Sequence, residues 1–262
     1  MSEFYLRKDL ESVWHEDDIF KSVHQLTGEV YRAVKNRRTL RVEINNRIYF
    51  AKIHGTVGWG EILKNLITLR WPILGATNEY VASLALKDAG VRVPEVAAFG
   101  IRGLSPASRE SFILTDAVEP SISLEDYCVA WKYEKPARLV KNTLIDQVAT
   151  MTRQMHALGL NHRDLYICHF LLDSVCLQQG RFELTMIDLH RAQQRKQVPR
   201  RWLVKDLGSL LFSSMELGLQ PRDWLRFIRV YTDGSLRSNL ADAQGSFWRD
   251  VERRAHSLCE ES

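Results

Sequence analysis

Three ionisable side chains stand in an order that suits phosphoryl transfer. Lys52 lies in the apolar-rich run 50–53 (FAKI), Asp164 ends the sequence Asn-His-Arg-Asp, and Asp188 follows an isoleucine further along the chain. Phosphoryl transfer asks a protein mainly to position the reactants and to neutralise charge. A lysine can hold nucleotide phosphates, one aspartate can bind Mg²⁺ through its hard oxygens, and another can accept the proton of the attacking hydroxyl. We therefore expect Lys52, Asp188 and Asp164 to fill these three roles.

The surroundings of the two aspartates match signature segments of protein-kinase-like folds. Residues 161–169 (NHRDLYICH) stand where such folds have the catalytic loop H-R-D-L-x-x-x-N, with His169 at the asparagine position. Asp188 stands where they have D-F-G, and Lys52 where they have V-A-I-K. Each segment alone is a weak signal. Several in the right order, each beside the expected element, are strong evidence.

Further polar residues are predicted to support this machinery. Glu79 opens a predicted helix after Lys52 and would fix the direction of the lysine, although Glu61 on the preceding helix is a rival. Asp206 is expected either to hold the backbone of the catalytic loop or only to cap a helix, where Asp is favoured. His162 is expected to be structural, because buried structural histidines outnumber those that act as ligands.

Strands come first along the chain and helices later. Strands are expected where β-branched and aromatic residues gather, and helices where apolar residues recur at steps of three and four. The expected strands are 30–34, 39–44, 47–53, 96–99 and 111–115; the expected helices are 59–69, 79–89, 140–158, 205–217 and 221–231; a hairpin joins 171–177 to 182–187; turns lie at 35–38 and 45–46, and a linker at 115–120.

This order predicts an α+β, two-lobed, protein-kinase-like fold. The N-terminal lobe, residues 1–117, would be an antiparallel β-sheet with a helix and would bind nucleotide phosphates. The mainly helical C-terminal lobe, residues 118–262, would carry the catalytic loop and the metal and acceptor sites. A cleft between two lobes is a preferred place for a ligand.

Composition excludes several classes of protein. With 262 residues, of which 45% are hydrophobic and 26% charged, the chain is globular rather than disordered or fibrous. Four cysteines without a C-x-x-C pair predict reduced thiols, not a disulfide framework or a zinc site. We expect no transmembrane span and no signal peptide, hence an intracellular protein. The net charge of +4 comes without a nucleic-acid reader motif, which argues against nucleic acid as a partner.

The same segments resemble the lipopolysaccharide core heptose(I) kinase family of the WaaP type, from about residue 10 to about residue 235. The resemblance rests on 36–41 (NRRTLR), 75–76 (GA), 121–128 (SISLEDYC), 161–172 (NHRDLYICHFLL), 187–193 (IDLHRAQ) and 198–207 (VPRRWLVKDL). These runs are far more specific than a general kinase signature. The resemblance implies a protein-kinase-like fold and ATP-dependent phosphorylation of the first heptose of the inner core, at position 4, with Mg²⁺ on the aspartate named above.

The resemblance also implies where the protein acts and with what. The acceptor would be a lipid-linked core oligosaccharide at the cytoplasmic face of the Gram-negative inner membrane. The protein would then be cytoplasmic and peripheral to that membrane. The family has been associated with acyl carrier protein, an acidic partner that a basic surface could serve.

Two positions depart from the general kinase pattern. No G-x-G-x-x-G lies between the first two strands, so Arg37 or Arg38 is expected to supply cationic phosphate contacts, with a solvated turn as the alternative. His169 replaces asparagine at a usual metal-ligand position. Because imidazole suits Mg²⁺ poorly, we expect His169 to contact phosphate or a metal-bound water.

Basic side chains cluster just downstream of Asp188. They would attract an anionic acceptor, unless they form an ordinary solvated face. The cluster comprises Arg191, Arg195, Lys196, Arg200, Arg201 and Lys205, and its four arginines are the candidates for contact with the acceptor. The predicted helix 221–231 has an apolar face opposite arginines. This pattern is typical of a helix that lies on a membrane surface or, more commonly, of a core helix with one solvent-exposed side.

Other functions remain open from the residues alone. The chain could be a protein (tyrosine) kinase or a kinase of another core sugar. It could also be a nucleotide-binding pseudokinase that serves as a scaffold, although the presence of Lys52, Asp164 and Asp188 argues against that reading.

Overall fold

The chain folds into two compact units in a computed structural model that describes residues 2–14, 19–34, 37–56, 75–105, 108–234 and 242–261. The first unit comprises residues 1–84 and 94–117, and the second comprises 85–93 and 118–262. The helix expected at 59–69, and with it Glu61, lies outside the described residues. The assignment of nucleotide binding to one part of the chain and catalysis to the other stays a prediction.

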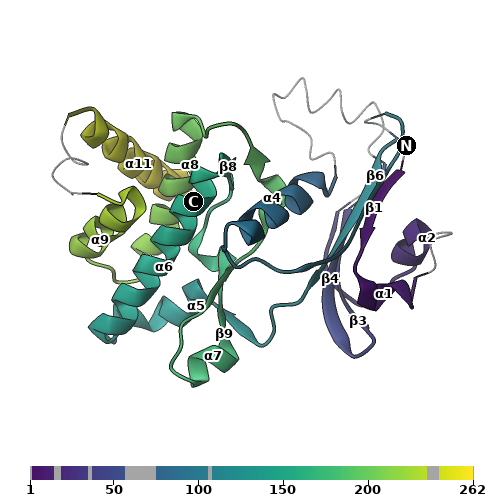
Figure 1. Ribbon diagram of the computed structural model, residues 1–262. Helices are drawn as coiled ribbons and strands as arrows, with labels where there is room; N and C mark the ends of the chain where they lie inside the picture. The colour runs from purple at the N-terminus through teal and green to yellow at the C-terminus, as the bar shows by residue number, and fades with distance from the viewer. Residues whose placement is uncertain are drawn as a thin grey trace. The chain divides into compact units, whose positions relative to one another are not determined.

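An antiparallel six-stranded sheet forms the first unit, in the order β1-β5-β6-β4-β3-β2 (Figure 1). Apolar side chains that alternate along β3 and β4, such as Leu40 and Ala51, pack in one core cluster with Leu10 and Phe20 from two short helices. The elements are β1 (Ser2–Leu6), α1 (Lys8–Glu11), α2 (Ile19–His24), β2 (Glu29–Val34), β3 (Arg37–Ile44), β4 (Arg47–His54), β5 (Val96–Arg102) and β6 (Glu110–Asp116).

The turn between β3 and β4 determines the register of the strand that carries Lys52. Asn45 and Asn46 both have positive φ, 51° and 60°, a conformation that asparagine tolerates better than most residues and that two-residue hairpin turns require. The prediction of a turn at 35–38 is wrong for Arg37 and Arg38, which belong to a strand. Arg37 already pairs with His54, so β3 begins there.

Helix α4 (Thr77–Asp88) begins two residues earlier than the sequence predicts. Thr77 and Asn78, which would be the capping candidates for a helix that begins at Glu79, therefore lie inside the helix. The predicted end is confirmed, because Gly90 has φ +77° and the next N–H, of Val91, returns to the carbonyl of Leu86. This left-handed turn is a common way for a helix to end.

Helices dominate the second unit. The predicted apolar stripe of α6 (Arg138–Ala157) is buried, including Leu144, Val148 and Met155. Helix α6 packs against α9 (Pro221–Thr232), and α8 (Arg200–Met215) packs against α11 (Asp242–Glu261). The shorter helices are α5 (Leu124–Cys128), η2 (Val129–Lys132), η3 (Ile167–His169), α7 (Ser174–Gln178) and η4 (Leu189–Arg191).

Short strands connect these helices. Strands β7 (Ser121–Ser123), β9 (Phe170–Asp173) and β10 (Leu184–Met186) form one small sheet, and β8 (Leu160–Asn161) pairs with β11 (Gln193–Gln194). The predicted hairpin is confirmed in β9 and β10, but 174–178 is helical rather than extended. The reason is local: the Asp173 carboxylate accepts hydrogen bonds from the N–H groups of Val175 and Cys176 and caps α7.

The apolar face of α9 faces protein. Phe227 and Ile228 are buried, and the ring of Trp224 meets that of Trp248 on α11 edge to face. This packing supports the reading of α9 as a core helix with a wet side over contact with a membrane surface. Among the described residues, every helix is too short or too polar to cross a bilayer.

Candidate active site

The first unit presents a lysine held by a glutamate. Lys52 Nζ donates to Glu79 Oε1 at 2.7 Å, and only 15% and 7% of the two side chains are exposed. The hairpin register places the lysine on the middle of β4, and Glu79 lies in the first turn of α4. The pair expected from the sequence is therefore present. Such a contact limits the directions that the ammonium group can take.

Asp206 holds the catalytic loop through its backbone. This fully buried carboxylate on α8 accepts hydrogen bonds from the N–H of His162 at 2.7 Å and the N–H of Arg163 at 2.8 Å. His156 Nε2 lies 3.3 Å from it. The predicted brace is confirmed, and the alternative of a helix cap is wrong because α8 already begins at Arg200.

Two residues of the site have left-handed backbone. Arg163 has φ +75° and Asp188 has φ +63°. Because a side chain other than glycine costs roughly 1–2 kcal/mol in this conformation, surrounding contacts must hold it. Strain of this kind concentrates at functional sites, and nothing in the local sequence predicted it here.

His162 is scaffold, as predicted. Its ring is fully buried and stacks on that of His169, with ring centroids 5.6 Å apart. Nε2 lies 3.0 Å from the backbone carbonyl oxygen of Ile187, and because a carbonyl only accepts, Nε2 carries the proton. Burial lowers the pKa of His162, so the ring is neutral at neutral pH.

His169 connects the two aspartates. Its Nδ1 donates to the backbone carbonyl oxygen of Asp164 at 2.8 Å, and its Nε2 lies 3.7 Å from the Asp188 carboxylate. The other oxygen of Asp188 contacts His190 Nδ1, a residue that sequence reasoning did not select although it stands in the same motif. Nε2 of His169 therefore lies close to the Asp188 carboxylate, and a phosphate or water bound beside that carboxylate would be within its reach.

A single carboxylate suits a magnesium ion that also binds phosphates. In the described part of the chain, His, Cys, Asp and Glu side chains form no group of three or more that could hold a metal on their own. Mg²⁺ in phosphoryl-transfer sites usually takes one or two carboxylates, with waters and substrate phosphates completing its shell. Asp188, whose carboxylate lies beside the imidazole rings of His169 and His190, offers the single carboxylate that this arrangement needs.

Arg191 binds the predicted base. Its Nη1 donates to both carboxylate oxygens of Asp164, at 2.8 and 3.0 Å. The sequence placed Arg191 toward the acceptor, and the structure puts it directly on Asp164. Both side chains keep some exposure, 34% for Arg191 and 18% for Asp164, so a substrate hydroxyl can still approach.

The other predicted acceptor arginines divide into two groups. Arg195 donates to Asn161 Oδ1 at 2.6 Å and lies over the ring of Trp202, as does Arg201. The close approach of the chain here needs glycine, since a Cβ on Gly159 would lie 1.8 Å from the Arg195 carbonyl oxygen. Arg200 instead pairs with Asp250 on α11, away from this group.

The two arginines predicted as phosphate contacts lie at the start of β3. Arg37 faces His54 across the sheet and Arg38 faces Ile53. The guanidinium of Arg38 donates to the backbone carbonyl oxygen of His24 at 2.8 Å. This described contact is structural, and a phosphate role for either arginine stays a prediction.

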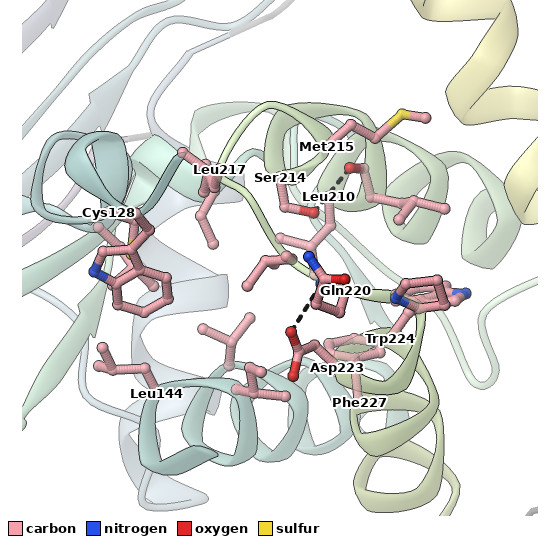
Figure 2. A pocket seen from close by; sticks show the side chains of 18 of the residues that line it. Cys128, Leu144, Leu210, Ser214, Met215, Leu217, Gln220, Asp223, Trp224 and Phe227 are labelled. Atoms are coloured by element: carbon pink, nitrogen blue, oxygen red, sulfur yellow. Dashed lines mark hydrogen bonds between the residues drawn. The ribbon is translucent and has the colours of Figure 1, made fainter. Parts of the chain in front are cut away.

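An apolar cavity of about 370 Å³ lies within the second unit (Figure 2). Most of its wall comes from α5, α6, α8 and α9, with further side chains from η2, η3 and α11, and Leu144, Leu210 and Phe227 are directed into it. Cys128 lines one end, and burial raises the pKa of its thiol to about 12. Sequence reasoning missed the cavity because several separate elements build it, and the sequence pattern of each is that of an ordinary core helix.

Comparisons with known proteins agree with this geometry. Residues 21–231 match the lipopolysaccharide kinase (Kdo/WaaP) family. The chain is 44% identical to the lipopolysaccharide core heptose(I) kinase WaaP of Pseudomonas aeruginosa, over 97% of this chain and 95% of that protein. It is 48% identical to WaaP of Escherichia coli strain K12, over 90% and 89%. A solved structure of WaaP in complex with acyl carrier protein is 39% identical, with a TM-score of 0.85 over 98% of this chain and 99% of that one. The expected kinase-like fold is thereby confirmed.

Proposed function

This chain belongs to the lipopolysaccharide kinase (Kdo/WaaP) family, and from that premise we propose that it is a lipopolysaccharide core heptose(I) kinase, a phosphotransferase that acts on a heptose hydroxyl. The phosphoryl donor is ATP and the acceptor is a lipid-linked core oligosaccharide, phosphorylated at position 4 of its first heptose. One observation supports the residue roles. His169 contacts both the backbone of Asp164 and the carboxylate of Asp188, and the backbone of the same loop is hydrogen-bonded to Asp206.

Asp164 orients the heptose hydroxyl and takes its proton as the bond to phosphorus forms. General-base help of this kind contributes on the order of 10²–10⁴ in rate. Arg191 holds both oxygens of the carboxylate and so keeps it pointed in one direction. Lys52, directed by Glu79, binds the nucleotide phosphates. Arg37 or Arg38 adds positive charge for the same phosphates.

Asp188 is the residue that would hold Mg²⁺. When bound, the ion neutralises charge on the phosphates of the donor. His169 donates Nδ1–H to the loop carbonyl, so Nε2 of the neutral ring would accept from a water that binds the ion, and Nε2 would donate to a phosphate oxygen only when the ring carries a second proton. His190 contacts one oxygen of Asp188 and so orients the carboxylate.

The decisive experiment incubates the protein with labelled ATP, Mg²⁺ and core glycolipid from which the phosphates have been removed. Mass spectrometry should place the label on the first heptose. Asp164→Asn should bind nucleotide as the wild type does and lose most of the transfer; wild-type turnover in that variant would contradict its role as base. Label on the protein alone would favour a protein kinase instead.

Asp188→Ala tests the metal role separately. We expect the affinity for ATP with Mg²⁺ to fall, because one of the ion's hard ligands is lost, while the affinity for ATP with EDTA stays at the wild-type value. Isothermal titration calorimetry measures both. An unchanged affinity for the magnesium complex would remove Asp188 from this role.

An acyl carrier protein is proposed as a partner of the second unit. The support is the likeness to WaaP solved in complex with acyl carrier protein, together with the apolar cavity, whose walls suit the acyl group that such a carrier holds. Peripheral attachment to the cytoplasmic face of the inner membrane would bring the protein to its lipid-linked acceptor.

Native mass spectrometry of the purified protein tests this partner. We expect an additional mass equal to that of an acylated carrier. Ser214→Trp, which fills space beside Met215 and Leu217, should reduce the bound fraction. Val175→Trp, at an exposed position of α7 that does not line the cavity, should not. Equal occupancy in the two variants would place the acyl group elsewhere.

A further inference from the structure

Trp202 is surrounded by positive charge. Four cationic groups lie over its ring on α8, at distances of 5.1–5.8 Å from the ring centroid to the charged atom. They belong to Arg163, Arg195, Arg201 and Lys205. An indole face attracts cations by about 0.5–2 kcal/mol each, which holds them in place without neutralising their charge.

The carboxylates of this region are already engaged. Asp164 has both oxygens on Arg191, and Asp206 has both on backbone N–H groups of the catalytic loop. Within the described ranges of the chain, no carboxylate lies within ion-pairing distance of Lys205 or Arg163. Positive charge is therefore in excess directly beside the predicted base.

The excess is unfavourable for the protein alone. Partial burial lowers the pKa of Lys205, and the positive charge of Arg191 lowers it further. Burial and the same arginine lower the pKa of Arg163. The Nε atom of Arg163 is buried, and the described residues supply no hydrogen-bond acceptor for it. Partly buried cations without counter-ions are costly, so their presence beside a catalytic group indicates a functional reason.

We propose that Lys205 and Arg163, held against Trp202 beside Asp164, form an anion site that binds a negatively charged group of the sugar acceptor next to the hydroxyl that is phosphorylated. The inference rests on the proposed function; Lys205 belongs to the basic cluster that the sequence places toward the acceptor, and Arg163 is added by the structure. The anion is one that the acceptor keeps after its phosphates are removed, such as a carboxylate, because such an oxyanion has the chemistry that these cations recognise.

The geometry favours the acceptor over the nucleotide as the source of the anion. The charges that act on Lys205 are those of Arg191, Asp164, Arg163 and Asp206. Asp188, the candidate metal ligand, instead contacts His169 and His190. The cationic group therefore lies with the base, which must touch the acceptor, and not with the residue that would bind the metal and the donor phosphates.

Lys205→Met tests the site, since it removes the charge and keeps the length of the stem. We expect the KM for dephosphorylated core glycolipid to rise about tenfold, while the KM for ATP stays within about twofold. Lys205→Arg should restore most of the glycolipid KM. Arg249→Met, which removes one exposed charge from α11, is the matched control and should behave as the wild type.

Two results would overturn the proposal. The first is an unchanged glycolipid KM in Lys205→Met. The second is a rise in the KM for ATP by the same factor as that for glycolipid, which would put the anion on the nucleotide. Melting curves for each variant separate a loss of binding from a loss of fold.

A wild-type protein that leaves the glycolipid unlabelled would contradict the proposed function, and the anion site would then be judged by direct binding. Calorimetry with inorganic phosphate, without nucleotide or metal, should show binding to the wild type and to Lys52→Met. The heat should vanish in Lys205→Met. Equal heats in Lys205→Met and the wild type, or no binding by the wild type, would refute the site.

Discussion

Replacing Asp206 by alanine should separate the catalytic loop from α8. The carboxylate accepts two short hydrogen bonds from the backbone N–H groups of His162 and Arg163. Both bonds are inaccessible to water, because Asp206 is fully buried. They also hold Arg163 at φ +75°, a conformation that its side chain disfavours. Without the carboxylate, the two hydrogen bonds are lost, and we expect the backbone of Arg163 to leave its unfavourable left-handed conformation.

The size of the effect follows from those contacts. A hydrogen bond to a charged group contributes about 1.5–3 kcal/mol, so the loss of two lowers the free energy of unfolding by roughly 3–6 kcal/mol. That is a large part of the about 5–15 kcal/mol that keeps a protein folded. Asp206→Asn keeps one acceptor oxygen and turns an amide N–H toward the second backbone donor, so it should lose about half as much.

Urea unfolding followed by circular dichroism measures these free energies, and turnover of the folded fraction measures the effect on Asp164. Asp250→Ala is the control, because that aspartate forms surface ion pairs with Arg200 and Arg253, which contribute little. If Asp206→Ala unfolds within about 1 kcal/mol of the wild type, the two hydrogen bonds do not hold the loop and the reasoning is refuted.

Three further outcomes are expected. Stability should fall as the pH drops below about 6.5, because His162 takes up a proton in the unfolded chain and, with its pKa lowered by burial, does not do so in the folded protein. The urea midpoint should therefore change less between pH 5 and 8 in His162→Gln than in the wild type, and an equal change would contradict this. Iodoacetamide at pH 8 should label exposed Cys259 well before Cys128 and Cys168, whose pKa values burial raises to about 12 and about 11; peptide mass spectrometry showing equal rates would argue against it. Glu79→Gln should raise the KM for ATP about fivefold with little change in Tm, since a neutral amide directs Lys52 less firmly, and an unaltered KM would remove Glu79 from that role.

Local pattern predicted most of the sheet and the main helices. Alternation in β3 and β4, the Asn45-Asn46 turn, and the apolar stripe of α6 are properties of neighbouring residues, so they can be read without the fold. Where prediction was wrong, a nearby polar contact had decided the outcome. The carboxylate of Asp173, for example, caps α7 where the apolar run suggested a strand.

The sequence by itself determined which residues are candidates for the catalytic roles and in what order they stand. Lys52, Asp164 and Asp188 stand beside recognisable segments, and phosphoryl transfer needs few residue types, so their chemistry could be named early. For Asp206 the sequence left two roles open, a brace of the loop or a helix cap, and the structure shows the brace.

Only the tertiary structure decided what surrounds those residues. Arg191 contacts Asp164, Lys205 lies over the ring of Trp202, and several elements enclose an apolar cavity, because helices and loops distant in the chain pack against one another. Such contacts depend on the directions of side chains after packing, and a sequence pattern records only spacing along one element. The charged residues can be read from the sequence, but only packing determined that Arg191 would contact the predicted base Asp164. Packing also placed Lys205 and Arg163 over the ring of Trp202.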